Sequence, residues 1–197
     1  MAINSISYDA VPPAYKEIKE AYYESYNYEK MQDYNKAIKA LALVSKEYPK
    51  SYTVNIRLGW LYYLKNKYAN SIHHYQKAIE IAPDSTEAKL GYSYPLLAQK
   101  KYDEVATISY QIMQKDHYNY SANLNLAFAL RMQGKHNMAK KITEKMTARY
   151  PTNISFLTEL ALINYAQENK ETAYNIFSDI LILDPNNSTA KSYLGIK

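Results

Sequence analysis

The chain has 197 residues and a formal net charge of +5 at pH 7. Its 4 Gly and 7 Pro are too few for the turns of an all-β fold of this length. No apolar run approaches the roughly 18 residues of a membrane span, and the first residues lack the basic and apolar stretches of a signal peptide. Because cysteine is absent, disulfides, thiolate metal sites and a cysteine nucleophile are excluded. We therefore expect a soluble, cytoplasmic, α-helical protein.

The first 13 residues show no helical periodicity and end in Pro12-Pro13. Proline disfavours a helical conformation in the residue before it and is favoured in the first turn of a helix. We therefore predict an N-terminal arm over residues 1–13 and a helix that starts near Ala14. The remainder, 14–197, is expected to form a single domain.

A period of 34 residues runs through this domain. Helix-ending prolines stand at Pro49, Pro83, Pro151 and Pro185, and His117 occupies the place of the missing one. Self-similarity at a fixed period is the signature of a repeat architecture, in which neighbouring repeats bury one continuous core. The predicted repeats are 18–51, 52–85, 86–119, 120–153, 154–187 and a partial repeat, 188–197.

Each repeat is predicted to contain two helices. In the first repeat these are 15–31 and 34–47, and the partial repeat opens a short last helix at 188–197. Asn66 and Gly134 stand at the same place of the turn between helices, where a left-handed residue is often needed and both residue types tolerate it. Pro95 lies inside the first helix of the third repeat, where it removes a backbone hydrogen bond and is expected to kink the helix.

The eighth position of each repeat is never larger than alanine, as expected where two helix backbones approach closely. These residues are Ser25, Gly59, Ser93, Ala127, Ala161 and Gly195.

The second repeat resembles the tetratricopeptide pattern Trp-x2-Leu-Gly-x2-Tyr, Ala-x3-Phe, Pro, with Asn55 in place of Trp. The matching residues are Leu58, Gly59, Tyr62, Ser71, Tyr75 and Pro83. The resemblance covers residues 18–197. It implies an all-α fold, a right-handed α-solenoid of five helix pairs plus a short C-terminal helix, and a protein that binds other proteins without catalysis.

In that family one stripe of each first helix packs and a second stripe faces the concave surface. The second stripe is apolar and largely aromatic here, and large apolar patches usually mark contact surfaces. We therefore predict a groove for a peptide or protein, although neighbouring helices could also account for these side chains. The groove residues are Tyr22, Tyr26, Ile56, Trp60, Tyr63, Leu90, Tyr94, Leu97, Leu124, Phe128, Met132, Leu162 and Tyr165.

Basic residues gather in the fourth repeat, which has 6 Lys and Arg against 1 acidic residue. Lys141, Lys145 and Arg149 are spaced four apart on its second helix, with Lys135 and Lys140 beside them. This basic patch is interpreted as a solvated outer face or, alternatively, as a docking surface for an acidic partner. Nucleic acid is not expected, because no aromatic residues interleave with these charges.

No chemistry-bearing motif is found. His73 and His74 are adjacent, so they project about 100° apart on a helix, and no zinc-ligand spacing accompanies them. A glycine-rich phosphate loop and a Ser-His-acid motif are also lacking. The sequence therefore predicts neither a metal, nor a cofactor, nor an enzyme.

The predicted function is that of a non-enzymatic scaffold whose aromatic groove binds a peptide or protein. One alternative is self-association, with the groove filled by a second copy or by the arm, which carries Ile3, Ile6, Tyr8 and Val11. Another is that the chain is the docking part of a larger assembly or enzyme.

Overall fold

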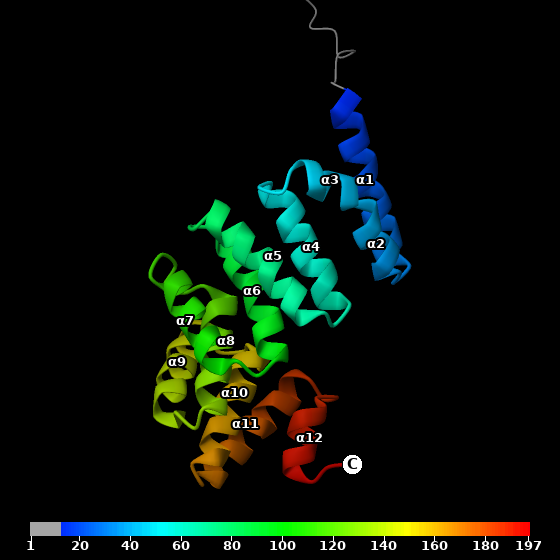
Figure 1. Cartoon of the computed structure of the whole chain (residues 1–197). Helices are drawn as coiled ribbons and strands as arrows, with labels where there is room; N and C mark the ends of the chain where they lie inside the picture. The colour runs from blue at the N-terminus through cyan, green and yellow to red at the C-terminus, as the bar shows by residue number, and fades with distance from the viewer. Residues whose placement is uncertain (1–12) are drawn as a thin grey trace, which may run out of the picture. The chain divides into compact units, whose positions relative to one another are not determined.

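The computed structural model describes residues 13–197, and every regular element in this range is a helix (Figure 1). The helices are α1 (Pro13–Lys30), α2 (Tyr34–Ala40), α3 (Ala42–Glu47), α4 (Tyr52–Leu64), α5 (Tyr68–Ile81), α6 (Thr86–Ala98), α7 (Tyr102–Met113), α8 (Tyr120–Met132), α9 (His136–Arg149), α10 (Ile154–Ala166), α11 (Lys170–Leu183) and α12 (Ser188–Leu194). The predicted arm lies outside the described residues except for Pro13, which begins α1.

The chain forms two compact units, of which unit 1 ends at Pro95 and unit 2 begins at Leu96. The boundary falls inside α6, which continues through Pro95 as one helix. The single-domain prediction for 14–197 stays a prediction, and each unit is described by itself.

The helices follow the 34-residue register. Five of them, α4, α6, α8, α10 and α12, begin at the first residue of a predicted repeat. The second helices α2, α5, α7, α9 and α11 begin at the seventeenth position. The predicted all-α fold of paired helices with a short C-terminal helix is thereby confirmed.

The turn inside each full repeat contains one left-handed residue, always at the fifteenth position. These are Gln32, Asn66, Lys100, Gly134 and Glu168, with φ between 57° and 73°. The next residue donates its N–H to the carbonyl five residues before it, as Lys67 does to Tyr62 at 2.8 Å. This backbone bond closes the helix C-terminus whatever the side chain. The same bond explains why Gln32, Lys100 and Glu168, which were not expected to be left-handed, adopt the conformation of Asn66 and Gly134.

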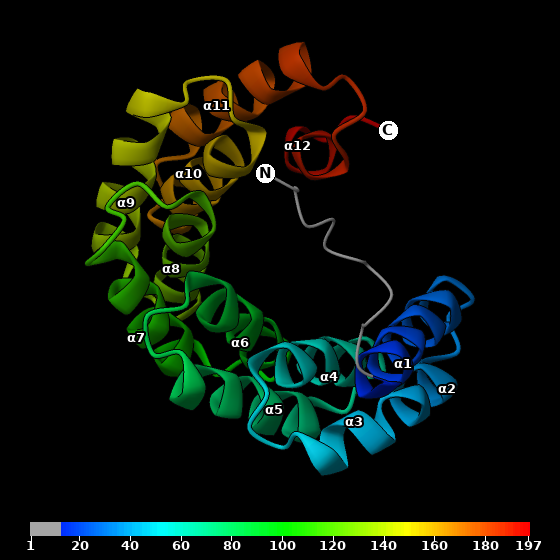
Figure 2. The same cartoon turned by 90° about the horizontal axis from the view of Figure 1, so that it is seen from above.

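Unit 1 buries its core between the first helices and the second helices. In Figure 2, α1 and α4 lie on one side of this unit and α2, α3 and α5 on the other. The core cluster contains Ala37, Leu41, Val44, Val54, Leu58 and Leu61.

The prediction of one continuous helix over 34–47 was wrong. The N–H of Leu41 bonds to the carbonyl of Ile38, three residues back, at 3.1 Å, and this tightened turn separates α2 from α3. Leu41 is fully buried in the core cluster, so the interruption lies on the packed side of the helix.

Unit 2 repeats this arrangement, with α8, α10 and α12 on one side and α7, α9 and α11 on the other (Figure 2). Its C-terminal core cluster contains Ala161, Ala173, Phe177, Ile180 and Ala190. Asparagine caps its first helices, since the side chains of Asn119, Asn153 and Asn187 accept the N–H three residues ahead.

The small residues at the eighth position are buried as predicted in the five full repeats. A Cβ added to Gly59 would lie 3.0 Å from the Tyr75 ring, and Ser71 donates to the Gly59 carbonyl at 2.7 Å, so the two helices of this repeat do approach closely. Gly195 differs from this prediction. It is the left-handed C-cap of α12, with φ 69° and open space where a Cβ would be, because α12 ends there.

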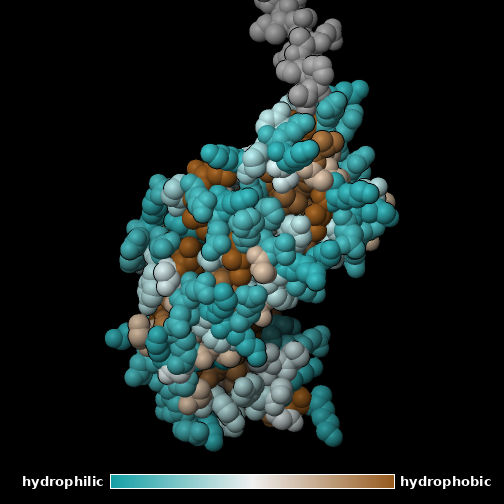
Figure 3. Space-filling view, in the orientation of Figure 1, coloured by the Kyte–Doolittle hydropathy of each residue, from teal (hydrophilic) through white to brown (hydrophobic). Residues whose placement is uncertain are grey.

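In Figure 3 the visible surface is mainly hydrophilic, and hydrophobic residues show in separate patches, one of which lies between α1 and α4. Within residues 13–197, none of the helices has the length and apolar character that crossing a membrane requires.

Candidate interaction surface

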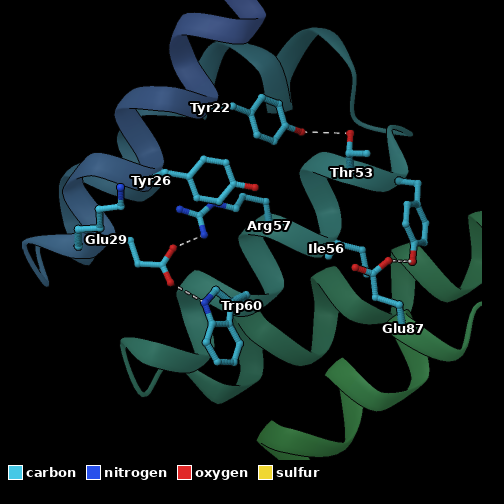
Figure 4. Close-up of a pocket in the computed structure, with 10 residues that line it drawn as sticks. Tyr22, Tyr26, Glu29, Thr53, Ile56, Arg57, Trp60 and Glu87 are labelled. Carbon is cyan, nitrogen blue, oxygen red and sulfur yellow. Dashed lines mark hydrogen bonds and ion pairs between the residues drawn. The ribbon is translucent and has the colours of Figure 1, made fainter.

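A pocket of about 790 Å³ opens between α1, α4 and α6 in unit 1. Figure 4 shows the side chains of α1 and α4 facing one another across it. Four of its ten lining residues are aromatic: Tyr22, Tyr26, Tyr52 and Trp60. The lining is completed by Glu29, Lys30, Thr53, Ile56, Arg57 and Glu87.

An ion pair holds the α1 and α4 walls together. Glu29 pairs with the guanidinium of Arg57, and its other oxygen accepts the indole N–H of Trp60 at 2.7 Å (Figure 4). Arg57 also donates to the Ser25 hydroxyl at 3.2 Å, and its side chain is only 7% exposed. Tyr26 covers it, with the guanidinium carbon 4.0 Å from the ring centre. The aromatic faces of Tyr26 and Trp60 are thus positioned by polar contacts beneath them.

Two tyrosine hydroxyls are held by hydrogen bonds at the wall of the pocket. Tyr22 donates to Thr53 at 3.1 Å, and the hydroxyl of Tyr52 donates to Glu87 at 2.8 Å. Burial raises the pKa of both phenols above 10.0, so both stay neutral at physiological pH. The carboxylate of Glu87 therefore stands at the edge of the pocket beside uncharged rings.

A second hollow of about 440 Å³ adjoins this pocket and shares Ile56, Trp60 and Glu87 with it. Its other lining residues are Tyr75, Leu90, Gly91 and Tyr94. The ring centres of Trp60, Tyr63 and Tyr94 lie 5.5 to 6.0 Å apart in all three pairs. The seven groove residues predicted in unit 1 are therefore close neighbours.

Unit 2 contains a separate pocket of about 530 Å³. It is lined by Leu97 of α6, by Leu124, Asn125 and Phe128 of α8, by Ile154, Ser155, Thr158 and Glu159 of α10, and by Asn187. Three predicted groove residues, Leu97, Leu124 and Phe128, are among them.

The last three predicted groove residues do not line this pocket. Met132 is 43% exposed at the end of α8. Leu162 and Tyr165 pack against the C-terminal core cluster, and the ring centre of Tyr165 lies 4.8 Å from that of Tyr193 in α12. The final helix therefore covers part of the surface that the repeat pattern had assigned to a ligand.

None of the thirteen predicted groove residues is buried. By contrast, the packing stripe of the same helices is buried, for example at Leu58, Leu61, Leu126 and Leu130. Neighbouring helices therefore leave the aromatic stripe accessible over much of its length.

The predicted basic patch is not a set of free side chains. Lys145 donates to the carbonyl of His117 at 3.1 Å, and both Lys145 and Arg149 lie over the ring of Tyr118, at 5.4 and 4.3 Å. Burial lowers the pKa of Lys145. These two side chains thus fasten α9 to the loop after α7.

The other members of the patch differ from one another. Lys140 donates to the side chain of Asn164 at 2.9 Å, and Lys135 lies 4.0 Å from a carboxylate oxygen of Asp103. Lys141 is exposed. Most of the patch therefore makes contacts within unit 2.

Sequence reasoning did not identify the polar members of the unit 1 pocket: Glu29, Lys30, Tyr52, Thr53, Arg57 and Glu87. One signal was present, because Glu29 and Arg57 are opposite charges 28 residues apart, at the twelfth position of one repeat and the sixth of the next. Arg131 and Glu159 have the same spacing and also form an ion pair, at 2.7 Å. Within residues 13–197, no group of three or more His, Asp or Glu is placed to hold a metal ion.

Tetratricopeptide repeat models match three segments of the chain. One matches residues 54–85, and another matches residues 21–51 and 121–153. These segments fall in the first, second and fourth of the 34-residue repeats. No curated protein matches the chain in sequence.

Solved structures of similar fold span nearly the whole chain. MamA 41-end from Desulfovibrio magneticus RS-1 has a TM-score of 0.79 at 14% identity, covering 87% of this chain and 97% of its own. A second MamA structure has a TM-score of 0.75 at 16% identity, covering 92% of this chain and 97% of its own. YrrB, described as a TPR protein with an unusual peptide-binding site, has a TM-score of 0.76 at 13% identity, covering 95% of this chain and 100% of its own.

Proposed function

The chain belongs to the tetratricopeptide repeat family of interaction scaffolds, and we propose that it binds a peptide or protein in the hollow lined by α1, α4 and α6. The binding energy comes from burying partner side chains against Tyr22, Tyr26, Trp60 and Tyr94. Aromatic side chains bury a large area and dominate interface energies, which supports this assignment.

The observation that carries the proposal is the accessible face of Trp60. This side chain lines both hollows of unit 1, and its N–H already donates to Glu29. A partner can therefore cover the ring without leaving a buried N–H unpaired, which would cost about 1–3 kcal/mol. Tyr26 is 47% exposed over Arg57 and Tyr94 is 42% exposed, so both add accessible area on either side.

The test begins with affinity purification and mass spectrometry, which identify the partners that the wild type retains and a Trp60→Ala variant loses. Calorimetry with a purified partner should then show a loss of about 2 kcal/mol or more for Trp60→Ala, the range of interface hot spots. The affinity should depend little on salt, because the contact is mainly apolar.

Tyr26→Ala should also weaken partner binding. Tyr23→Ala is its matched control, since Tyr23 lies on the same helix, is 57% exposed and does not line the pocket. Lys141→Ala tests the basic patch. Both controls should bind as the wild type does. Unchanged binding by Trp60→Ala, or unfolding of that variant in circular dichroism, contradicts the proposal.

Self-association through the same surface is the alternative, with a second copy or the arm as occupant. Light scattering separates the two functions. A dimer that Trp60→Ala converts to a monomer would favour self-association. A wild type that is monomeric with and without residues 1–12 favours an external partner.

A further inference from the structure

The pocket of unit 2 occupies the same repeat positions as the pocket of unit 1. Six of its lining residues lie 102 positions, or three repeats, after a lining residue of the first pocket. The corresponding residues are Tyr22 and Leu124, Tyr26 and Phe128, Tyr52 and Ile154, Thr53 and Ser155, Ile56 and Thr158, and Arg57 and Glu159.

The ion pair beside each pocket is also equivalent, with its charges exchanged. In unit 1 the α1 residue is Glu29 and the α4 residue is Arg57, whereas in unit 2 α8 supplies Arg131 and α10 supplies Glu159. In both, the arginine lies over the aromatic residue at the ninth position, which is Phe128 in unit 2, at 5.2 Å. The two sites therefore share one framework and differ in what their walls present.

The walls of the unit 2 pocket are mainly aliphatic. Leucine and isoleucine replace the tyrosines of the unit 1 pocket at Leu124 and Ile154, and Leu97 adds a third aliphatic side chain. Its one charged lining residue, Glu159, accepts from two nitrogens of Arg131, at 2.7 and 3.1 Å. A charged ligand group would lose its hydration there without gaining an unpaired opposite charge, so the pocket favours an uncharged one.

Free polar groups border the aliphatic walls. Within residues 13–197, no hydrogen bond joins the side chains of Asn125, Ser155 and Thr158 to other groups. Ser155 is exposed, and Asn125 and Thr158 are half-buried. They offer donors and acceptors of the kind that a peptide backbone can use.

We propose that the unit 2 pocket is a second binding site, selective for an aliphatic side chain of a protein partner, which is held by Leu97, Leu124, Phe128 and Ile154. The flanking peptide groups of the partner bond to Asn125, Ser155 and Thr158. A volume of about 530 Å³ lies within the usual range of ligand pockets. This inference rests on the proposed function in taking a protein as the partner, but it concerns a separate site.

The test uses the α-amides of N-acetyl-leucine, N-acetyl-alanine and N-acetyl-aspartate as probes, titrated into the ¹⁵N-labelled full chain. The leucine probe should shift the amide signals of Asn125, Ser155 and Thr158. Its affinity should exceed that of the alanine probe by at least about tenfold, since each methylene in an apolar pocket is worth about 10-fold or more. The aspartate probe should give no saturable shift at these amides.

Ser155→Phe supplies the blocking variant, because Ser155 is exposed, lines the pocket and makes no hydrogen bond whose loss would harm the fold. It should abolish the leucine-dependent shifts. Ser178→Phe, at an exposed position of α11, is the matched control and should leave them unchanged.

Three results overturn the inference: no leucine-dependent shift at these amides, equal shifts with the leucine and aspartate probes, or shifts that persist in Ser155→Phe. The unit 1 site is tested separately, by measuring how the Trp60→Ala variant binds the partner. Either site can therefore be rejected without rejecting the other.

Discussion

Glu29 and Arg57 join consecutive repeats of unit 1 through an ion pair that lies under the aromatic wall of the pocket. The pair that Arg131 and Glu159 form in unit 2 has the same 28-residue spacing and the opposite charge order. The framework therefore accepts either order, provided that the two charges remain opposite.

Glu29→Gln should lower the free energy of unfolding by about 2–3 kcal/mol. Arg57 is almost fully buried, and removing its counter-charge leaves a buried cation without compensation. Urea denaturation followed by circular dichroism measures the change.

The double variant Glu29→Arg with Arg57→Glu provides the control for this prediction. It reproduces the charge order of Arg131 and Glu159 and should be more stable than Arg57→Glu alone. Equal stability of the double and single variants would show that the ion pair does not determine the packing of α1 on α4.

Gly91→Ala should destabilise the protein by about 1–3 kcal/mol, the cost of overpacking a filled core. A Cβ at Gly91 would lie 2.2 Å from an atom of the Tyr75 ring, which is only 3% exposed and cannot move into solvent. Thermal unfolding measures the loss.

Combining Gly91→Ala with Tyr75→Leu should cost less than the sum of the two single changes, because the smaller side chain makes room for the methyl group. Strict additivity would indicate that the ring and the glycine do not compete for space.

Stability should fall as the pH is lowered from about 6.5 to about 4, because of His74. Burial, followed by the charges of His73 and Lys77, lowers the pKa of His74 to about 4 in the folded chain. The unfolded chain binds the proton near 6.5, so it takes up more protons in this window and folding becomes less favourable.

The expected loss is about 1–2 kcal/mol, since the ring retains some contact with solvent. Melting temperatures between pH 4 and 7 test it. His74→Gln should flatten the profile, whereas the exposed His73→Gln should not. A profile unaffected by His74→Gln would assign the pH dependence to another group.

Asn55→Ala should cost about 1–3 kcal/mol, because the side-chain amide of Asn55 donates to the carbonyls of Pro49 and Ser51, at 3.0 and 2.8 Å. Its oxygen lies 3.0 Å from Nδ1 of His74. Asn123 makes equivalent bonds in the fourth repeat.

Asn175→Ala, at an exposed position, is the control for Asn55→Ala and should change stability by less than about 0.5 kcal/mol. Equal effects at the two positions, measured by urea denaturation, would contradict a role for the Asn55 amide at the repeat junction.

The sequence alone determined the repeat architecture. The 34-residue period placed the starts of α4, α6, α8, α10 and α12, and the small residues at the eighth position predicted close helix contacts. These features depend on local backbone preferences and on the periodic burial of one helix face, and both follow from the order of residues along the chain.

Only the tertiary structure decided which accessible side chains meet in a pocket. It paired Glu29 with Arg57, seated Tyr26 over the pair, fastened Lys145 and Arg149 to Tyr118, and packed Tyr165 against α12. Periodicity assigns a residue to a face of its helix, but the reach and rotamer of each side chain, and the helix that lies opposite, determine its contacts. The tertiary structure therefore divides nine of the thirteen predicted groove residues between the two hollows of unit 1 and the pocket of unit 2, whose walls differ.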